Sequence, residues 1–267
     1  MKKMLFITVS ILLLGYITIC ILLYIYQERI IFFPEKLSED YPLQFPNAEE
    51  LKIKTSDGIS LHGILFKADS ASKGVIFYLH GNAGSLRLWG DVASTYTALR
   101  YDVFMLDYRG YGKSEGQITS QEQMFDDVET VYKNLLSRYS QDKIIILGYS
   151  IGTGVATYLA SVNKPKMLIL QAPYYNMAYM MKQVVPFAPT FILKYKFETN
   201  KFIQLCSMPI VIFHGDSDEV IPYGSSLKLK PLLKESDTLI TLYGQGHKGM
   251  SYQPQYIDEI DRILNQN

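Results

Sequence analysis

Ser150 stands at the centre of the sequence Gly-Tyr-Ser-Ile-Gly at positions 148–152. A short apolar segment typical of a strand (143–147) precedes this motif, and a segment typical of a helix (153–161) follows it. A serine between glycines at a strand-to-helix corner forms a nucleophile elbow, a turn so tight that neither glycine position has room for a Cβ atom. Because this turn exposes the serine hydroxyl, the motif predicts that Ser150 is a nucleophile.

A serine hydroxyl is a weak nucleophile at neutral pH, so it needs a base to take its proton and an acid to orient that base. His247 lies in a loop directly after the last predicted strand, and we expect it to be the base. Three carboxylates, Asp216, Asp218 and Glu219, follow the preceding strand. We expect Asp218 to be the orienting acid, because it lies far enough past the strand end to reach the imidazole. Asp216 is expected to bind backbone donors of its turn, and Glu219 to face solvent.

Attack by a serine on an acyl carbonyl places negative charge on the carbonyl oxygen, and two backbone N–H groups are needed to receive that charge. Ile151 follows the nucleophile and is expected to supply one of them. The second is expected from the loop His-Gly-Asn-Ala-Gly at 80–84, where Asn82 or Ala83 can donate and Asn82 is preferred.

The remaining histidines and the other glycine-rich loop are expected to be structural. His80 and His214 should hold their loops by hydrogen bonds, and His62 lies in an early hairpin. The loop at 107–116 lacks the spacing of a P-loop, and the chain has no Gly-x-Gly-x-x-Gly fingerprint. We interpret this loop as a tight turn pinned by an Asp–Arg interaction. No His, Cys and carboxylate cluster has metal-ligand spacing, so we expect neither a metal nor a cofactor.

The composition excludes several classes of protein. The 267 residues include 26 basic and 26 acidic side chains, so the net charge is zero. The chain therefore lacks the excess of basic charge that is typical of nucleic-acid-binding proteins. Cys20 and Cys206 are too few for a disulfide framework. The 21 Tyr and 13 Phe argue against disorder. The length suits one α/β domain with a full core, and no obligate protein partner is evident.

The N-terminal sequence is typical of a membrane anchor. Residues 4–26 contain no charge, and a bilayer-spanning helix takes about 20 such residues. A cleaved signal peptide is the alternative, but the run exceeds a typical apolar core and no Ala-x-Ala-like site follows. We therefore predict a single-pass anchor at 1–27, followed by a connector at 28–48 that lies along the membrane or the domain surface.

The orientation of this anchor follows from the flanking positive charges. Lys2, Lys3 and the terminal amine slightly outnumber Arg29 and Lys36 on the other side of the apolar run. Because positive charge favours the cytoplasmic side, we expect the catalytic domain on the extracytoplasmic side.

The rest of the chain alternates short apolar runs with helix-length segments. Residues 51–55 and 60–66 look like a hairpin joined at Asp57-Gly58, and Ser120 with Gln123 looks like a capping box opening a helix to about 138. The apolar runs predict a mostly parallel sheet covered by helices on both faces. They lie at 75–79, 103–106, 144–147, 167–170, 210–213 and 239–242.

One interval is longer than an ordinary connection between strands. Residues 173–209 contain aromatic and methionine-rich patches and the internal prolines Pro186 and Pro189. Since long loops in compact domains are usually functional, we predict a small cap at about 174–208 over the carboxyl edge of the sheet. An ordinary helical crossover is the alternative.

Five motifs together resemble the α/β-hydrolase superfamily, specifically its serine aminopeptidase-like and membrane-anchored α/β-hydrolase-domain proteins. The motifs lie at 80–84, 107–112, 148–152, 214–222 and 246–247. Anchored members also resemble this chain in the Phe-Phe-Pro at 32–34. The resemblance implies an α/β-hydrolase fold, here at 49–267, and a cofactor-free serine hydrolase acting on esters, thioesters or occasionally amides. It does not identify the substrate, because this fold hosts many chemistries.

We therefore expect a membrane-anchored serine hydrolase that cleaves carboxylic ester or thioester bonds through an acyl-enzyme. The anchor and the apolar cap favour acyl lipids or other acylated molecules as substrates. Three alternatives stay open. The same residues would serve a peptidase or amidase, or acyl transfer to an alcohol. The third alternative is an inactive membrane scaffold of this fold.

Overall fold

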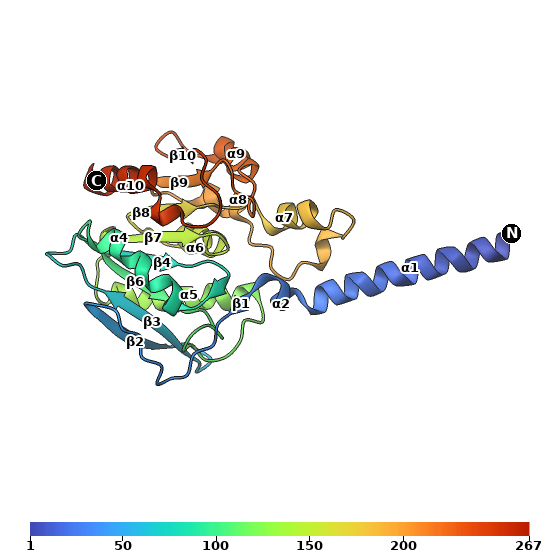
Figure 1. The fold of residues 1–267 in the computed structure, drawn as a ribbon, viewed down its shortest axis with the longest axis horizontal. Helices are drawn as coiled ribbons and strands as arrows, with labels where there is room; N and C mark the ends of the chain where they lie inside the picture. The colour runs from blue at the N-terminus through green and yellow to red at the C-terminus, as the bar shows by residue number, and fades with distance from the viewer. Residues whose placement is uncertain (267) are drawn as a thin grey trace.

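The computed structural model describes residues 1–266, so the last residue of the predicted domain at 49–267 lies outside the described chain. Its centre is an eight-stranded sheet in the order β10-β9-β8-β7-β4-β6-β3-β2 (Figure 1). The strands are β2 (Ala48–Lys54), β3 (Ser60–Phe66), β4 (Val75–Leu79), β6 (Asp102–Leu106), β7 (Ile144–Tyr149), β8 (Met167–Gln171), β9 (Ile210–Gly215) and β10 (Thr238–Leu242).

The strand pairing follows the predicted pattern. β2 pairs antiparallel with β3, and β3 pairs antiparallel with β6. The other neighbours, from β6 through β4 to β10, are all parallel. Gly58 takes a left-handed conformation with φ +86° in the turn between β2 and β3, as the Asp-Gly pair predicts. Every residue of β4 and β7 is buried, since helices cover both faces of the sheet.

Two sets of helices bury the two faces. The cluster on one face includes side chains of α5 (Gln121–Leu136), α6 (Gly152–Val162) and α9 (Gly224–Leu229), and α8 (Thr199–Phe202) packs against α6. The cluster on the other includes side chains of α3 (Leu86–Trp89), α4 (Ala93–Thr97) and α10 (Pro254–Gln266). These features are those of the predicted α/β-hydrolase fold.

The N-terminal capping box predicted for α5 forms in part. The Ser120 hydroxyl accepts a hydrogen bond from the Gln123 backbone N–H at 3.1 Å. The Gln123 side chain, however, accepts from the N–H of Thr119 at 3.0 Å, one residue earlier than a capping box requires. The helix ends at Leu136, two residues before the predicted end.

The N-terminal apolar run forms one exposed helix, α1 (Lys2–Ile25), which is long and apolar enough to cross a membrane. It projects away from the domain, and the C-terminus lies at the opposite end of the molecule (Figure 1). The chain then forms α2 (Gln27–Ile31) and β1 (Phe33–Pro34). β1 pairs in parallel with β5 (Ala83–Gly84), so the connector is bonded to the loop after β4.

The interval between β8 and β9 has two parts. α7 (Met177–Val184) and the loop after it project on the side of the domain from which α1 emerges (Figure 1). The second part packs inward, because Tyr195, Phe197 and Ile203 are buried in the core. The division of the chain into an anchor at 1–27, a connector at 28–48 and a cap at about 174–208 stays a prediction.

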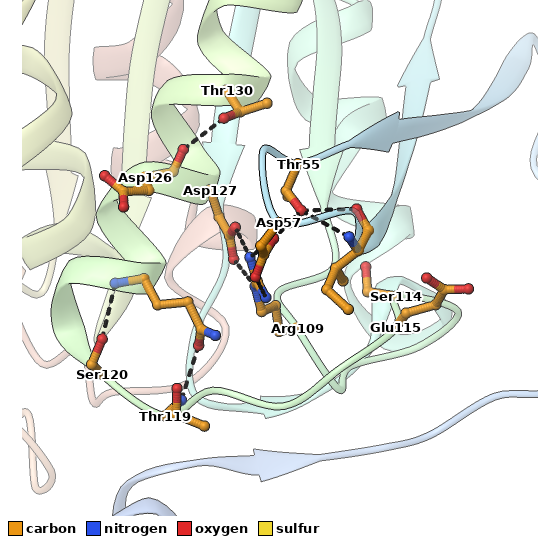
Figure 2. Close-up of polar contacts among 12 residues, drawn as sticks. Thr55, Asp57, Arg109, Ser114, Glu115, Thr119, Ser120, Asp126, Asp127 and Thr130 are labelled. Carbon is orange, nitrogen blue, oxygen red and sulfur yellow. Dashed lines mark hydrogen bonds and ion pairs between the residues drawn. The ribbon is translucent and has the colours of Figure 1, made fainter.

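Arg109, in the loop after β6, forms Asp–Arg pairs with partners from other elements rather than within its own loop. Its guanidinium binds Asp127 of α5 at 2.6 and 2.8 Å and Asp57 of the β2–β3 turn at 2.7 and 2.8 Å (Figure 2). Asp107 instead accepts the Leu86 N–H at 2.9 Å. Burial raises the pKa of Asp127, and the Arg109 guanidinium beside it opposes that rise.

We expect Arg109→Met to lower the free energy of unfolding by about 3 kcal/mol, because it leaves the buried Asp127 carboxylate without its cation. Thermal and urea denaturation of the detergent-solubilised full chain would measure this loss. Lys133→Met is the control, since Lys133 is exposed and its pair with Glu129 should contribute less than about 0.5 kcal/mol. Equal effects of the two substitutions would contradict the prediction.

Candidate active site

Ser150 occupies a strained turn between β7 and α6. Its φ is +54°, in the left-handed region that side-chain-bearing residues rarely adopt, and its N–H donates to the Gln171 carbonyl at 2.9 Å. A Cβ on Gly148 would come within 2.7 Å of the Ala156 Cβ, and one on Gly152 would collide with the Leu79 carbonyl oxygen. Both flanking glycines are therefore required by close packing, as the motif predicts.

The structure brings the three predicted side chains together at the carboxyl edge of the sheet. His247 Nε2 lies 3.0 Å from Ser150 Oγ, and His247 Nδ1 lies 2.8 Å from Asp218 Oδ2. All three residues are buried. This arrangement allows the imidazole to take a proton from the serine while the carboxylate fixes its tautomer.

Asp218 is held in place by several donors. Its Oδ1 accepts the N–H groups of Val220 and Ile221 at 2.9 and 2.8 Å, and His214 Nε2 lies 3.4 Å from Oδ2. Burial alone raises the pKa of Asp218, but the interactions with His214 and His247 outweigh it and hold that pKa well below its usual range. The carboxylate is therefore ionised at neutral pH.

The two residues predicted to supply the oxyanion donors line the same cavity as Ser150. Ile151 begins the turn into α6, and neither its N–H nor that of Asn82 makes a hydrogen bond within residues 1–266. The Asn82 carbonyl accepts from the Phe33 N–H at 2.8 Å, and its side-chain amide donates to the Ile31 carbonyl at 2.9 Å. The connector therefore holds the loop that carries one candidate donor.

A cavity of about 270 Å³ begins at Ser150, Ile151 and Asn82. Its other walls are almost entirely apolar, and they come from α7, the loop after β9 and the junction of α1 with α2. They include Leu23, Ile30, Ile31, Met177, Met180, Met181, Val184, Val185, Ile192, Leu193, Val220 and Ile221. The arrangement can accommodate an apolar group whose reactive end lies against the serine.

Comparisons with known proteins agree with this geometry. A family profile described as alpha/beta hydrolase fold matches residues 74–195. Protein YfhR of Escherichia coli K12 is 28% identical over 237 residues, with 82% of each chain covered. Protein bem46 of Schizosaccharomyces pombe is 29% identical over 217 residues, covering 75% of this chain and 72% of its own. The chain belongs to the α/β-hydrolase superfamily.

Two further similarities concern named hydrolases. The lysophosphatidylserine lipase ABHD12 of Danio rerio is 31% identical to this α/β hydrolase over 205 residues, covering 68% of this chain and 52% of the lipase. An esterase of Pyrococcus furiosus superposes with a TM-score of 0.69 at 17% identity, covering 88% of this chain and 97% of the esterase. The latter shows a shared fold, and the set as a whole supports hydrolase activity.

The loops around the triad of this α/β hydrolase have contacts that the sequence indicated only in part. Asp216 accepts the Gly244 N–H at 2.7 Å, so its backbone donor lies in the loop after β10 and not, as was predicted, in its own turn. Glu219 is exposed, as predicted, but its carboxylate also accepts the N–H of His247 at 3.0 Å. The Tyr149 hydroxyl donates to the His247 carbonyl. The backbone of the histidine loop is thus fixed from two sides.

The other histidines have structural contacts. His80 Nδ1 lies 2.7 Å from the Gly81 carbonyl oxygen, and burial lowers the pKa of His80, which favours the neutral ring. His214 Nδ1 lies 2.7 Å from the Ser226 hydroxyl, and His62 lies between Glu50 and Asp107. Among residues 1–266, no group of three or more His, Cys, Asp or Glu side chains could hold a metal ion.

We expect Asn82→Ala to lower kcat about tenfold with little change in KM, because it keeps the backbone N–H but removes one of the bonds that fix its direction. Steady-state kinetics on a short soluble ester would measure this change. Asn82→Asp, which keeps the shape but cannot donate to the Ile31 carbonyl, should show a similar loss. Full activity in both variants would show that the side chain does not position the loop.

Proposed function

We propose that this protein is a membrane-anchored serine hydrolase that cleaves ester or thioester bonds of acyl lipids or other acylated molecules. The observation that carries the proposal is one continuous cavity. It is lined by Ser150 and by both residues that carry the candidate oxyanion donors, and also by Leu23, near the end of the apolar helix α1. The reactive serine and a helix able to span a bilayer thus share the wall of one apolar cavity.

The proposed reaction has two steps. Ser150 Oγ attacks the acyl carbonyl carbon while His247 Nε2 takes its proton, and the N–H groups of Asn82 and Ile151 receive the oxyanion. The carbonyl re-forms as the leaving group departs with the proton from His247. Water then attacks the acyl-enzyme with His247 as base, which releases the acid and returns the proton to Ser150. Asp218 keeps Nδ1 protonated throughout.

The substrate class rests on the character of the cavity and on the relatives. An almost wholly apolar lining favours a hydrocarbon chain over a charged or peptide group. The similarity to a lysophosphatidylserine lipase and an esterase supports the same class. Anchoring by α1, which is part of this proposal, would keep the enzyme beside the acyl lipids of the membrane, and the flanking charges favour the extracytoplasmic side for the domain.

Fluorophosphonate labelling of the membrane fraction tests the nucleophile. The wild-type chain should be labelled, and Ser150→Ala and His247→Ala should not be, because the probe reacts only with an activated serine. A folded wild-type chain that resists the probe would favour the inactive scaffold.

We expect kcat/KM on a series of straight-chain esters to rise with acyl length, by up to about fourfold per CH₂, which corresponds to burial of about 0.8 kcal/mol each. The rise should stop when the cavity is filled. Esters and amides of the same acyl chain, measured side by side, separate an esterase from an amidase. A flat or falling profile would contradict an acyl-lipid substrate.

A further inference from the structure

The loop that follows α7 carries an exposed apolar surface. We call residues 184–191 the cap tip. Its large side chains Val184, Phe187 and Phe191 are 78%, 59% and 83% exposed. Such a group of apolar side chains is unfavourable in water and commonly marks an interaction site.

The cap tip contacts α1 well inside the apolar helix. The Tyr16 hydroxyl donates to the Phe187 carbonyl at 3.1 Å. Tyr16 lies nine residues before Ile25, where α1 ends, which corresponds to about 14 Å along the helix axis. The hydrocarbon core of a bilayer is about 30 Å thick and α1 is about 36 Å long. If α1 spans the core, the cap tip lies at the depth of the hydrocarbon.

The backbone carbonyls of the cap tip at 185–189 are suited to an apolar medium, where carbonyl groups need internal donors. All five carbonyl oxygens of residues 185–189 accept hydrogen bonds. The donors are Ala188 N–H to Val185, Lys182 Nζ to Pro186 and Ala188, Tyr16 hydroxyl to Phe187, and Ile192 N–H to Pro189. The two prolines have no N–H to satisfy.

Apart from the Lys182 ammonium, which is bonded to two cap-tip carbonyls, the charged groups near α1 lie at the base of the cap, level with the end of α1. Lys194 pairs with Glu28 at 3.1 Å and lies 4.8 Å from the centre of the Tyr24 ring. Gln27 is buried between these elements, donating to the Ile192 carbonyl at 2.7 Å and accepting the Lys194 N–H at 2.9 Å. Paired charges with an aromatic ring are typical of a membrane–water interface.

We infer that the cap tip inserts into the hydrocarbon of the bilayer beside α1, and that the substrate's acyl chain enters the cavity directly from the membrane. Leu23 of α1 and Val184 of the cap tip both line the cavity, so the two membrane-facing elements both form part of its wall. This inference rests on the proposed anchoring by α1. The apolar side chains of the cap tip are thus covered by the acyl chains of the membrane lipids.

Depth-dependent quenching tests the insertion. Phe191→Trp would be measured in the full chain reconstituted in phosphatidylcholine vesicles with brominated acyl chains, and the signal of native Trp89 would be subtracted using wild type. We expect blue-shifted emission that the brominated lipids quench. Val162→Trp is the control, because Val162 is exposed at the end of α6 farthest from Ser150. Equal quenching of the two variants, or none, would overturn the inference.

A kinetic experiment tests the entry route. The double variant Phe187→Glu/Phe191→Glu places two carboxylates in the cap tip, neither of them in the cavity lining. Since carboxylates are disfavoured in hydrocarbon, we expect hydrolysis of a long-chain ester embedded in vesicles to fall at least about tenfold. Hydrolysis of a short soluble ester should stay within about twofold. No difference between the two esters would contradict lateral entry.

Failure of the proposed function would look different. If wild type hydrolyses neither ester, the hydrolase proposal fails while the quenching result still reports on insertion. If wild type does not float with vesicles, the anchoring fails, and the inference fails with it.

Discussion

Ser150→Ala is expected to lower kcat by about a thousandfold or more, because no other group would form the acyl-enzyme. The side chain of Ser150 makes one hydrogen bond, to His247, so its loss should leave the fold intact. Kinetics on a soluble ester, together with the melting temperature of the same preparation, would measure both effects. Ser161→Ala, at the other end of α6, should stay within about twofold of wild type.

Two results would count against the proposed nucleophile. Activity retained in a folded Ser150→Ala protein would mean that another residue attacks the substrate. An equal loss in Ser161→Ala would mean that disturbance of α6, rather than loss of the hydroxyl, causes the effect.

Asp218→Asn is expected to lower kcat by roughly ten-thousandfold while preserving the geometry of the site. The asparagine carbonyl can still accept the N–H groups of Val220 and Ile221, which Oδ1 now accepts. Its amide would then face His247 Nδ1 as a donor. The imidazole must accept there, so its proton moves to Nε2, and it can no longer take the proton of Ser150.

Asp216→Asn is the matched control for this substitution. Asp216 lies in the same loop, but its carboxylate binds the Gly244 N–H rather than His247, so we expect a loss of less than about tenfold. Comparable losses in the two variants would show that the loop, and not the tautomer of His247, is responsible.

Local patterns predicted most of the sheet and the elbow. Apolar runs bounded by turns place β4 at Val75–Leu79 as expected, since a strand buried on both faces needs a continuous apolar segment. The elbow was predictable because the close packing of Gly148 and Gly152 leaves a direct trace in the sequence. The positions of Ser150, Asp218 and His247 were also predictable, because each residue follows a predicted strand.

Contacts between residues far apart in the chain left no such trace. The sequence does not show which acidic residues pair with Arg109. The packing of α5 and the β2–β3 turn against its loop selects Asp127 and Asp57. Gln27 resembles any polar residue after an apolar helix, yet it is buried and donates to the Ile192 carbonyl in the segment between β8 and β9. The contact of Glu219 with the His247 N–H depends on how two loops meet.

The pairing of β1 with β5 makes the site sensitive to where the chain is cut. Proteolysis directly after Ile25 would shed a domain in which Ile31 and Phe33 still hold Asn82. Proteolysis a few residues later, beyond Pro34, would remove the bonds from Ile31 and Phe33 and leave Asn82 held by the Tyr111 hydroxyl, which donates to its carbonyl at 2.7 Å. If α1 is the membrane anchor that we propose, the position of the cut would therefore decide whether the released domain keeps two of the bonds that hold its Asn82 loop.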